Sequence, residues 1–369
     1  MTERIFDTLV IGGGQTGLAV GHYLSKTGRT FLILDASARV GDAWRHRWDS
    51  LVLFTPAGFS GLPGMDFPAD HKDQFVTKDE AADFVERYAK DMGLPVLSGV
   101  RVERLTKEDD VFVAETANET FAARNVVVAM ANYQAPKIPG VATSLDPGIR
   151  QVHSHDYKSP SSLQDGPALV VGMGNSGAEI GLELARDRTT YVSGDPTAVI
   201  PFRLESWFGR KIGKHAVRFM ATKVLTTSTP IGRRVRPKLL KKAAPVVRAK
   251  PRDLLAAGAE RVPRVTGVRA GMPQLADGRT LDVANVVWCT GYRSGFDWIE
   301  MPIFDDEGKP RHHRGVVDEM PGLYFCGLFF QHSLWSETLT GMPRDARYVV
   351  EHLANRAVVG APADAPAGA

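Results

Sequence analysis

The chain has 369 residues, of which 43% are hydrophobic and 24% charged, and its formal net charge is +3. This length suits two domains with sizeable cores, and the composition is that of an ordinary globular protein, which excludes a disordered or fibrous chain. No apolar run is long enough to span a membrane and no signal-peptide pattern precedes the first strand, so we expect a cytoplasmic protein.

A glycine-rich turn, Gly12-Gly13-Gly14-Gln15-Thr16-Gly17, follows the first apolar strand and opens a helix. Gly12 allows the tight turn, Gly14 lets a pyrophosphate approach the backbone, and Gly17 lets the helix pack closely on the sheet. A second strand ends at Asp35, whose carboxylate can accept hydrogen bonds from a ribose. This order of elements predicts a dinucleotide site.

The segment after this site alternates between loop, helix and short strands. Residues 41–68 form a loop rich in aromatic residues, which are suited to the walls of a site for a flat ring system. Helical spacing from Asp79 to Met92 comes next. Strands are predicted at 100–105, 111–116, 120–123 and 126–129. Pro136, Pro139 and Gly140 then mark a linker.

The same pattern recurs 160 residues after the first turn, as Gly172-Met173-Gly174-Asn175-Ser176-Gly177. One such turn is weak evidence, but two in matching contexts are much stronger and predict two nucleotide cofactors. Asp195, at the position equivalent to Asp35, favours a free ribose diol and therefore NADH. Ser193 and Arg203 could instead receive the 2′-phosphate of NADPH, and the sequence does not decide between the two coenzymes.

Residues 203–252 hold fifteen Lys or Arg and a single acid, Glu205, interleaved with apolar residues. This spacing predicts one or two amphipathic helices. We interpret them as a solvated basic face that caps the second nucleotide domain. Attraction of the phosphates of NAD(P)H and peripheral contact with an anionic membrane surface are the alternatives. No nucleic-acid partner is expected, because no recognisable binding module accompanies the charge.

A buried strand at 286–288, a strand at 323–327 and a helix from about 345 to 357 complete the pattern. The last two would complete the first sheet. We therefore predict an α/β fold of two Rossmann-like dinucleotide-binding domains, of the three-layer ββα type, with the second inserted in the first. The two linkers between them would act as paired hinges.

The predicted domain limits follow from this path. Residues 1–144 and 285–360 form the discontinuous first domain, and residues 145–284 form the inserted one. The small-residue, Pro-rich tail at 361–369 is expected to be disordered.

The sequence offers little for thiol or metal chemistry. Cys289 and Cys326 are its only cysteines, lie far apart near the ends of apolar runs, and form no C-x-x-C motif. We expect small buried hydrophobic residues and no dithiol centre. His153 and His155 lack further ligands nearby, so no metal site is predicted.

Motifs spread over nearly the whole chain, except the tail, are shared with one enzyme family. Besides the two glycine turns they are Gly41-Asp42-Ala43-Trp44-Arg45, Asp49-Ser50-Leu51, Thr55-Pro56, Leu62-Pro63-Gly64, Ala178-Glu179 and Trp288-Cys289-Thr290-Gly291-Tyr292. Together they resemble the flavin-containing monooxygenase family, in particular its small bacterial members that bind FAD and NAD(P). The resemblance implies that reduced flavin reacts with dioxygen to give a peroxyflavin, which passes one oxygen atom to a small organic substrate.

The same resemblance implies roles for individual residues. FAD would be held by Gly12, Gly14, Gln15, Thr16, Gly17, Asp35 and Ala36, with Trp44 and Arg45 near its pyrophosphate or ring, Thr290 and Gly291 at the hinge, and Gly327 near the isoalloxazine. NADPH, or NADH because of Asp195, would be held by Gly172, Gly174, Asn175, Ser176, Ser193 and Arg203. No catalytic residue and no oligomeric state are assigned.

Phe54 is the departure that matters most for the reaction. Many members of the family carry an Asn after the Ser-Leu motif, near the flavin, and Phe54 lacks the amide that would stabilise the peroxyflavin. Two alternatives therefore stay open: an NAD(P)H:acceptor flavin reductase or oxidase without oxygenation, and a low-turnover flavin redox sensor.

Overall fold

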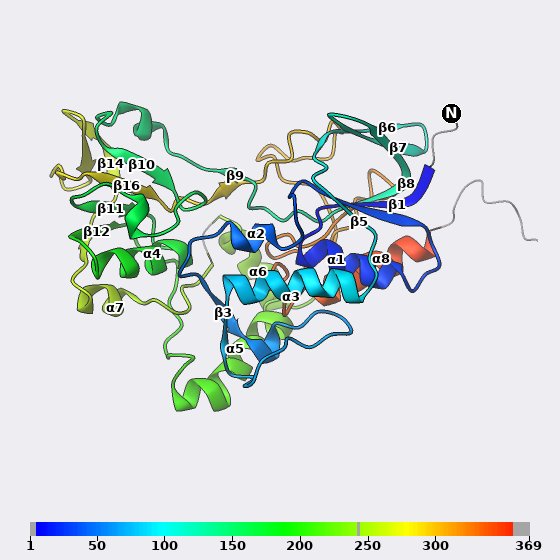
Figure 1. The fold of residues 1–369 in the computed structure, drawn as a ribbon, viewed down its shortest axis with the longest axis horizontal. Helices are drawn as coiled ribbons and strands as arrows, with labels where there is room; N and C mark the ends of the chain where they lie inside the picture. Colours follow the sequence, from blue (N-terminus) through cyan, green and yellow to red (C-terminus); the bar gives the residue numbers. More distant parts are fainter. Residues whose placement is uncertain (1–4, 242–243, 357–369) are drawn as a thin grey trace, which may run out of the picture.

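The computed structural model describes residues 5–241 and 244–356. Two β-sheets covered by helices lie at opposite ends of the molecule (Figure 1). The chain passes between them twice, at β9 (Ala135–Pro136) and β17 (Tyr292–Arg293), and these short strands pair antiparallel with each other. The tail at 361–369, which we expect to be disordered, lies outside the described residues. No helix in the described part of the chain is both long and apolar enough to cross a bilayer.

The first sheet has a parallel core of five strands in the order β5-β2-β1-β8-β18. Its strands are β1 (Ile5–Ile11), β2 (Phe31–Asp35), β5 (Val96–Ser98), β8 (Thr120–Val128) and β18 (Leu323–Phe325). Two antiparallel strands, β6 (Val102–Glu108) and β7 (Val111–Thr116), extend from the first half of β8. The C-terminal strand therefore completes this sheet, as the sequence predicts.

The parallel core of the first sheet is the middle one of three layers. One face packs on three helices, α1 (Gln15–Leu24), α3 (Lys78–Asp91) and α8 (Met342–Asn355). The opposite face, with Leu9 and Leu34, packs on residues of β6 and β7 such as Leu105 and Phe112. Parallel strands buried on both faces appear in the sequence as continuous apolar runs, which is why they could be predicted. The three-layer prediction is confirmed.

The second sheet is fully parallel, in the order β10-β16-β11-β12-β13. Its strands are β10 (Arg150–His153), β16 (Asn285–Trp288), β11 (Ala168–Val171), β12 (Thr190–Ser193) and β13 (Glu260–Val262). Helices α4 (Asn175–Ala185) and α7 (Pro251–Ala256) cover one face, and the hairpin of β14 (Val265–Arg269) and β15 (Met272–Leu275) covers the other.

One predicted boundary needs correction. We expected residues from 285 onward to belong to the first domain, but β16 pairs with β10 and β11 in the second sheet. The reason is that Val286 and Val287 are fully buried there, one on each face of the sheet. We propose that the chain returns to the first domain after Trp288, at β17.

Shorter elements connect these layers. They are α2 (Asp42–Arg45), β3 (Val52–Pro56), β4 (Phe75–Thr77) and the 3₁₀ turns η1 (Ala57–Phe59), η2 (Gly140–Ser144) and η3 (Pro160–Ser162). The basic segment forms α5 (Lys214–Phe219) between the π-helical turns η4 (Gly209–Gly213) and η5 (Met220–Val224), followed by α6 (Pro230–Leu239).

The ends of the basic segment contact the second nucleotide domain, through Arg203 and residues 245–248, but its middle does not cap that domain as we expected. Thr227 N donates to His332 O at 2.7 Å and Leu334 N donates to Leu225 O at 3.0 Å, which ties the segment to the C-terminal part of the first domain. Ala221 also joins a small apolar cluster with Leu334 and neighbouring residues. Some apolar side chains of the segment, including Ala221 and Leu225, are thus packed against the first domain, and this burial favours its position there.

Candidate active site

The first glycine turn joins β1 to α1 and leaves the N-terminus of α1 open. Gly14 is the N-cap residue, no side chain caps the helix, and a Cβ at Gly14 would meet nothing within 4 Å. At Gly17, by contrast, a Cβ would overlap the Gly12 carbonyl oxygen. Gly12 has a φ of +109°, which favours glycine. The turn therefore combines uncapped N–H groups with free space, as an anionic pyrophosphate requires.

Two strand ends converge on this turn. Asp35, at the end of β2, accepts a hydrogen bond at Oδ2 from Gly13 N at 2.6 Å, and the exposed Ala36 follows it. Gly327, just after β18, faces the turn so closely that a Cβ there would lie 2.7 Å from Thr16 Oγ1. The residues predicted to hold the two ends of FAD thus lie around one turn, and their contacts with the cofactor stay a prediction.

The second glycine turn joins β11 to α4 and repeats this geometry. Gly174 is the N-cap of α4 and no side chain caps the helix. Gly172 has a φ of +106°, and a Cβ at Gly177 would overlap the Gly172 carbonyl oxygen. Ser176 lies in the first turn of the helix. The chain therefore has two uncapped helix N-termini of the same geometry, which is suited to binding an anion.

Polar side chains at this second turn have partners within the protein. Asn175 donates from Nδ2 to Pro245 O at 3.1 Å and accepts at Oδ1 from Val247 N at 2.9 Å. Ser193 is buried and donates from Oγ to Pro263 O at 3.0 Å. Both side chains therefore position loops in this structure. Their predicted contacts with NAD(P)H would have to form in addition to these hydrogen bonds or replace them.

The charged residues near the ribose end of this site form pairs. Asp195 forms an ion pair of 2.6 Å with Arg261 on β13, and its side chain is 76% exposed. Arg203, which we expected to receive a phosphate, pairs instead with Asp253 on α7. Sequence reasoning missed Arg261, because nothing in the sequence around β13 shows that its guanidinium reaches the end of β12.

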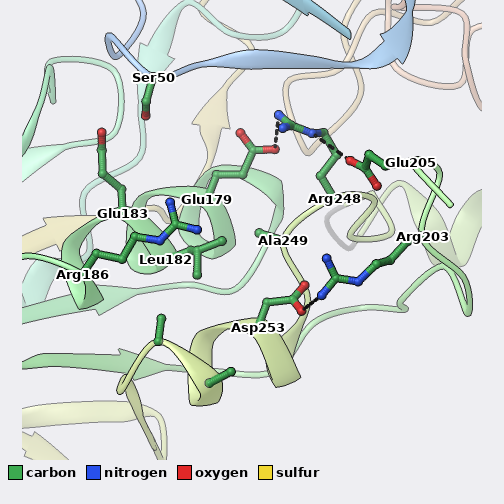
Figure 2. A pocket seen from close by; sticks show the side chains of 12 residues that line it. Ser50, Glu179, Leu182, Glu183, Arg186, Arg203, Glu205, Arg248, Ala249 and Asp253 are labelled. Carbon is green, nitrogen blue, oxygen red and sulfur yellow. Dashed lines mark hydrogen bonds and ion pairs between the residues drawn. The ribbon is translucent and has the colours of Figure 1, made fainter. Parts of the chain in front are cut away.

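A pocket of about 620 Å³ lies along the side of α4, and its lining includes no glycine of either turn (Figure 2). In it Arg248 reaches Glu179 and Glu205 at 3.7 Å each. Arg248 also donates to the Val52 carbonyl of β3 at 3.0 Å and so links the two domains. Burial raises the pKa of Glu179 to about 7, although the nearby guanidinium lowers it. Because its charges are largely matched, we interpret the pocket as a polar domain contact.

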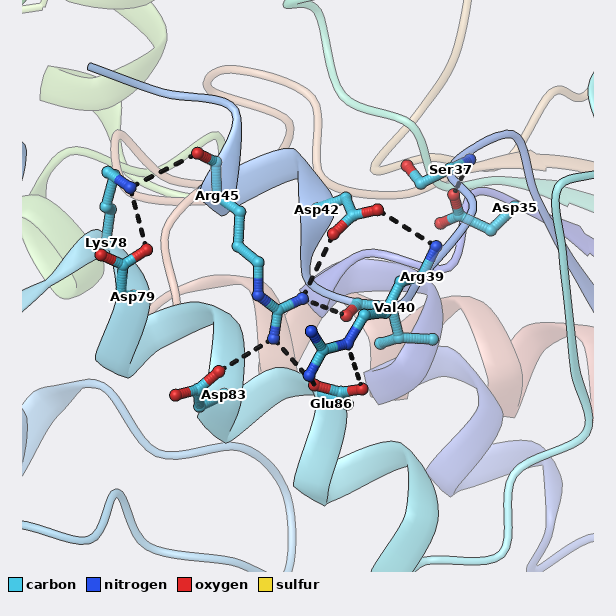
Figure 3. Close-up of polar contacts among 10 residues, drawn as sticks. All are labelled: Asp35, Ser37, Arg39, Val40, Asp42, Arg45, Lys78, Asp79, Asp83 and Glu86. Carbon is cyan, nitrogen blue, oxygen red and sulfur yellow. Dashed lines mark hydrogen bonds and ion pairs between the residues drawn. The ribbon is translucent and has the colours of Figure 1, made fainter. Parts of the chain in front are cut away.

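Arg45 joins α2 to α3, a helix that packs on the same face of the first sheet as α1 (Figure 3). Its guanidinium forms ion pairs with three carboxylates, those of Asp42 at 3.3 Å, Asp83 at 2.9 Å and Glu86 at 2.8 Å. Trp44 packs against the helical core. These contacts stabilise the loop after β2, and the proposed place of both residues near FAD stays a prediction.

A group of polar and aromatic side chains connects the first glycine turn to the linker strand β17. We call Gln15, Arg47, Tyr133, Tyr292 and Glu337 the junction cluster. Gln15 Nε2 donates to Glu337 O at 3.2 Å, and the Tyr133 hydroxyl donates to the Glu337 carboxylate. Arg47 donates to the Tyr292 hydroxyl at 3.0 Å, and the rings of Tyr292 and Tyr133 meet edge to face at 5.5 Å.

Glu337 has the pKa of a candidate acid–base group. Burial raises its pKa to about 7, and the hydrogen bond from Tyr133 partly opposes this change. A carboxyl that titrates near neutral pH at a domain junction is suited to proton transfer. Sequence reasoning named no such group, because Glu337 lies in a loop without a recognisable motif.

The predicted hinge residues tie the two linkers together. Gly291 O accepts hydrogen bonds from Lys137 N at 2.9 Å and from His153 Nε2 at 3.0 Å. Thr290 Oγ1 donates to the Lys137 carbonyl. Burial lowers the pKa of His153. The two linkers are therefore joined by hydrogen bonds where the domains meet. Rotation of the domains about these linkers stays a prediction.

The two cysteines lie at the ends of strands in different sheets. Cys289 follows β16, Cys326 follows β18, and both thiols are free. Burial raises the pKa of Cys289 to about 12 and that of Cys326 well above its usual value, which disfavours the reactive thiolate. Within the described residues, no group of three or more His, Cys, Asp or Glu side chains could hold a metal ion.

The sequence of this chain is similar to a known family and to known proteins. The model of the pyridine nucleotide-disulphide oxidoreductase family matches residues 9–197. An uncharacterised CzcO-like oxidoreductase of Geobacillus kaustophilus is 38% identical, covering 96% of this chain and 99% of its own length. A probable indole-3-pyruvate monooxygenase, YUCCA3 of Arabidopsis thaliana, is 28% identical, with 94% and 86% covered.

Solved structures give the same result. A flavin-containing monooxygenase from Stenotrophomonas maltophilia is 26% identical with a TM-score of 0.76, covering 94% of this chain and 98% of its own. The OTEMO complex with FAD and NADP is 15% identical with a TM-score of 0.68, covering 95% and 86%, a likeness that concerns the fold alone.

Proposed function

The chain belongs to the pyridine nucleotide-disulphide oxidoreductase family, and from this membership we propose that it is an FAD-dependent monooxygenase that consumes NAD(P)H. It would insert one atom of dioxygen into a small organic substrate. The resemblance to flavin-containing monooxygenases is confirmed by the structure from Stenotrophomonas maltophilia, and the chain is an oxidoreductase. Oxygenation and the substrate class are the parts that we propose.

The observation that carries the proposal is the pair of open helix N-termini. At both turns the helix lacks a side-chain cap, and any side chain at Gly17 or Gly177 would strike the turn itself. The first turn, with Asp35 and Gly327 beside it, would hold FAD, and the second would hold the nicotinamide coenzyme. When bound, FAD would supply the redox and oxygen chemistry, while the chain binds and orients the reactants.

The ion pair at the ribose end of the second site supports use of NADPH. The exposed Asp195 carboxylate alone would repel a 2′-phosphate, but the Arg261 guanidinium at 2.6 Å offsets this charge and adds a donor. The same carboxylate can accept hydrogen bonds from a free ribose diol. We therefore propose NADPH as the coenzyme, with NADH usable.

The acceptor of the electrons distinguishes the candidate functions. Cys326 is buried, Cys289 is half-buried, both have raised pKa values, and they follow strands of different sheets, so we propose that the electrons do not pass through a dithiol of this chain. Dioxygen is the acceptor that we propose, through the peroxyflavin that the family resemblance implies. Phe54, half-buried on β3 without an amide to offer, favours a flavin reductase or oxidase as the second candidate.

A stopped-flow experiment tests the proposal and both alternatives. We expect NADPH to bleach the flavin of the purified protein faster than NADH does at equal concentration. After mixing with dioxygen, a near-ultraviolet band that persists before the oxidised spectrum returns supports oxygenation. Immediate reoxidation without that band supports a reductase or oxidase. Failure of both coenzymes to bleach the flavin supports a redox sensor.

We further propose that Glu337 donates a proton during turnover, since forming water from the second oxygen atom consumes protons. Glu337 is protonated below its pKa of about 7, so the rate of NADPH oxidation should fall as the pH rises through 7. Glu337→Gln should lower kcat by about a hundredfold and remove this pH dependence. The exposed Glu108→Gln is the matched control and should keep the wild-type profile. A Glu337→Gln enzyme with the wild-type pH profile would exclude this role.

A further inference from the structure

Residues 207–224 form a continuous helical projection that we call the basic arm. It runs through η4, α5 and η5, and it extends below the rest of the molecule in Figure 1, in green around the α5 label. One side is attached to the first domain, because Lys214 pairs with Asp73 and the Arg218 guanidinium lies 4.7 Å from the centre of the Phe59 ring. These contacts attach the arm to the first domain.

The arm exposes several large apolar side chains. Trp207 is 73% exposed, Ile212 52%, Phe219 61% and Met220 48%. Single exposed apolar residues are normal on a protein surface, but several on one short projecting element indicate an interaction surface. Trp207 in particular is of the residue type enriched where membranes meet water.

Cations that form no direct ion pair in the described part of the chain lie among these apolar residues. Arg210, Lys211 and Lys223 are exposed, and within residues 5–241 and 244–356 none of them lies within ion-pair distance of a carboxylate. Glu205 is the only acid in the whole 203–252 segment. Interleaved aromatic, aliphatic and basic side chains on one helix are typical of a segment that lies in the plane of an anionic membrane surface.

A second copy of the chain fits this surface less well. In a symmetric dimer through the arm, the same patch would face itself, and the basic residues of both copies would meet without acids to neutralise them. A bilayer containing anionic lipids is complementary to both the cations and the apolar side chains of the arm. Its headgroups attract the cations and its interior accepts the apolar side chains. We therefore propose that the basic arm docks the protein on an anionic membrane surface without crossing it.

Vesicle co-sedimentation with the full-length, FAD-loaded protein tests this proposal. We expect binding to phosphatidylcholine vesicles that contain phosphatidylglycerol to be at least about tenfold tighter than to phosphatidylcholine alone. Added salt should weaken the binding, because it screens the attraction of the cations. The readout does not depend on turnover, so it is separate from the test of the monooxygenase.

The double variant Trp207→Ser with Phe219→Ser should weaken vesicle binding by at least about tenfold. The matched control is Ile138→Ser with Leu255→Ser, which removes two apolar side chains of 53% and 57% exposure outside the arm and should bind as wild type does. Flavin absorbance and circular dichroism confirm that each variant is folded. The proposal is overturned if the wild type ignores anionic vesicles, if the arm variant binds them unchanged, or if light scattering reveals a dimer that the arm variant abolishes.

Discussion

Gly17→Ala is expected to give a protein that no longer retains FAD, whereas Gly177→Ala is expected to retain FAD but resist reduction by NADPH. The added methyl group would overlap the Gly12 carbonyl oxygen in the first variant and the Gly172 carbonyl oxygen in the second. Because those oxygens belong to the turns themselves, the turn must open or the helix must move away. Either change misdirects the N–H groups that would receive the diphosphate.

We expect each variant to weaken binding of its own cofactor by at least about a hundredfold, or about 3 kcal/mol. The flavin content of the purified protein and the rate of flavin bleaching by NADPH measure the two effects separately. Gly140→Ala is the matched control, because its added methyl group would meet nothing within 4 Å. If Gly177→Ala lost its flavin while Gly17→Ala kept it, the assignment of the two sites would have to be exchanged.

Asp345→Asn is expected to stabilise the protein above neutral pH. Asp345 lies in the first turn of α8 and is 1% exposed; neither carboxylate oxygen makes a well-aligned hydrogen bond, although the nearby Ser336 hydroxyl and Arg344 guanidinium partly oppose the rise in its pKa. Its nearest cation is Arg344, whose Nε lies 3.8 Å from Oδ1. This burial raises the pKa of Asp345 to about 6, from 3.8 in an unfolded chain. A neutral amide of the same shape avoids burying the charge.

The sign of the pH effect follows from this raised pKa. The folded protein keeps the Asp345 proton up to about pH 6, whereas the unfolded chain releases it near pH 4, so the stability of the wild type falls as the pH rises between those values. Asn cannot lose a proton. The free energy of unfolding of Asp345→Asn, relative to that of the wild type, should therefore increase by about 2 kcal/mol between pH 4 and pH 8.

Urea unfolding of the FAD-loaded protein at the two pH values measures this difference. The exposed Asp282→Asn serves as the control and should show no such trend. An Asp345→Asn variant whose stability parallels that of the wild type at both pH values would show that the buried carboxyl does not titrate in this range.

The glycine turns could be predicted because all of their determinants are local. Strand, turn, helix and second strand follow one another within about thirty residues, and each glycine has a steric reason that the pattern alone supplies. Even so, one nearby element was misread. We predicted two strands at 120–123 and 126–129, but β8 is continuous from Thr120 to Val128.

The cause of that error is Asn125, a polar residue within an apolar run. Its side chain is buried, donates to Asp7 O at 2.9 Å and accepts from Arg356 Nη1 at 2.9 Å. These partners satisfy its amide and allow the strand to continue. They lie more than a hundred residues away in the sequence, so the pattern around Asn125 could not reveal them.

Glu337, the candidate acid–base group, could not be predicted from the sequence for the same reason. Glu337 and Tyr133 are separated by 204 residues and meet only because β8 and β18 are neighbours in the first sheet. Arg45 likewise finds Asp83 and Glu86 across the gap between α2 and α3. Single-sequence patterns report on periodicity and turns, whereas these pairs depend on how distant segments pack.

The attachment of the basic arm has a consequence for how the polypeptide is divided. By chain order the arm belongs to the inserted half, yet Ala221 and Leu225 pack with Phe330 and Leu334 of the other half. A fragment excised at the two linkers would carry an arm whose apolar partners had been left behind. We therefore expect the contiguous inserted segment to be less stable as an isolated fragment than it is within the whole chain.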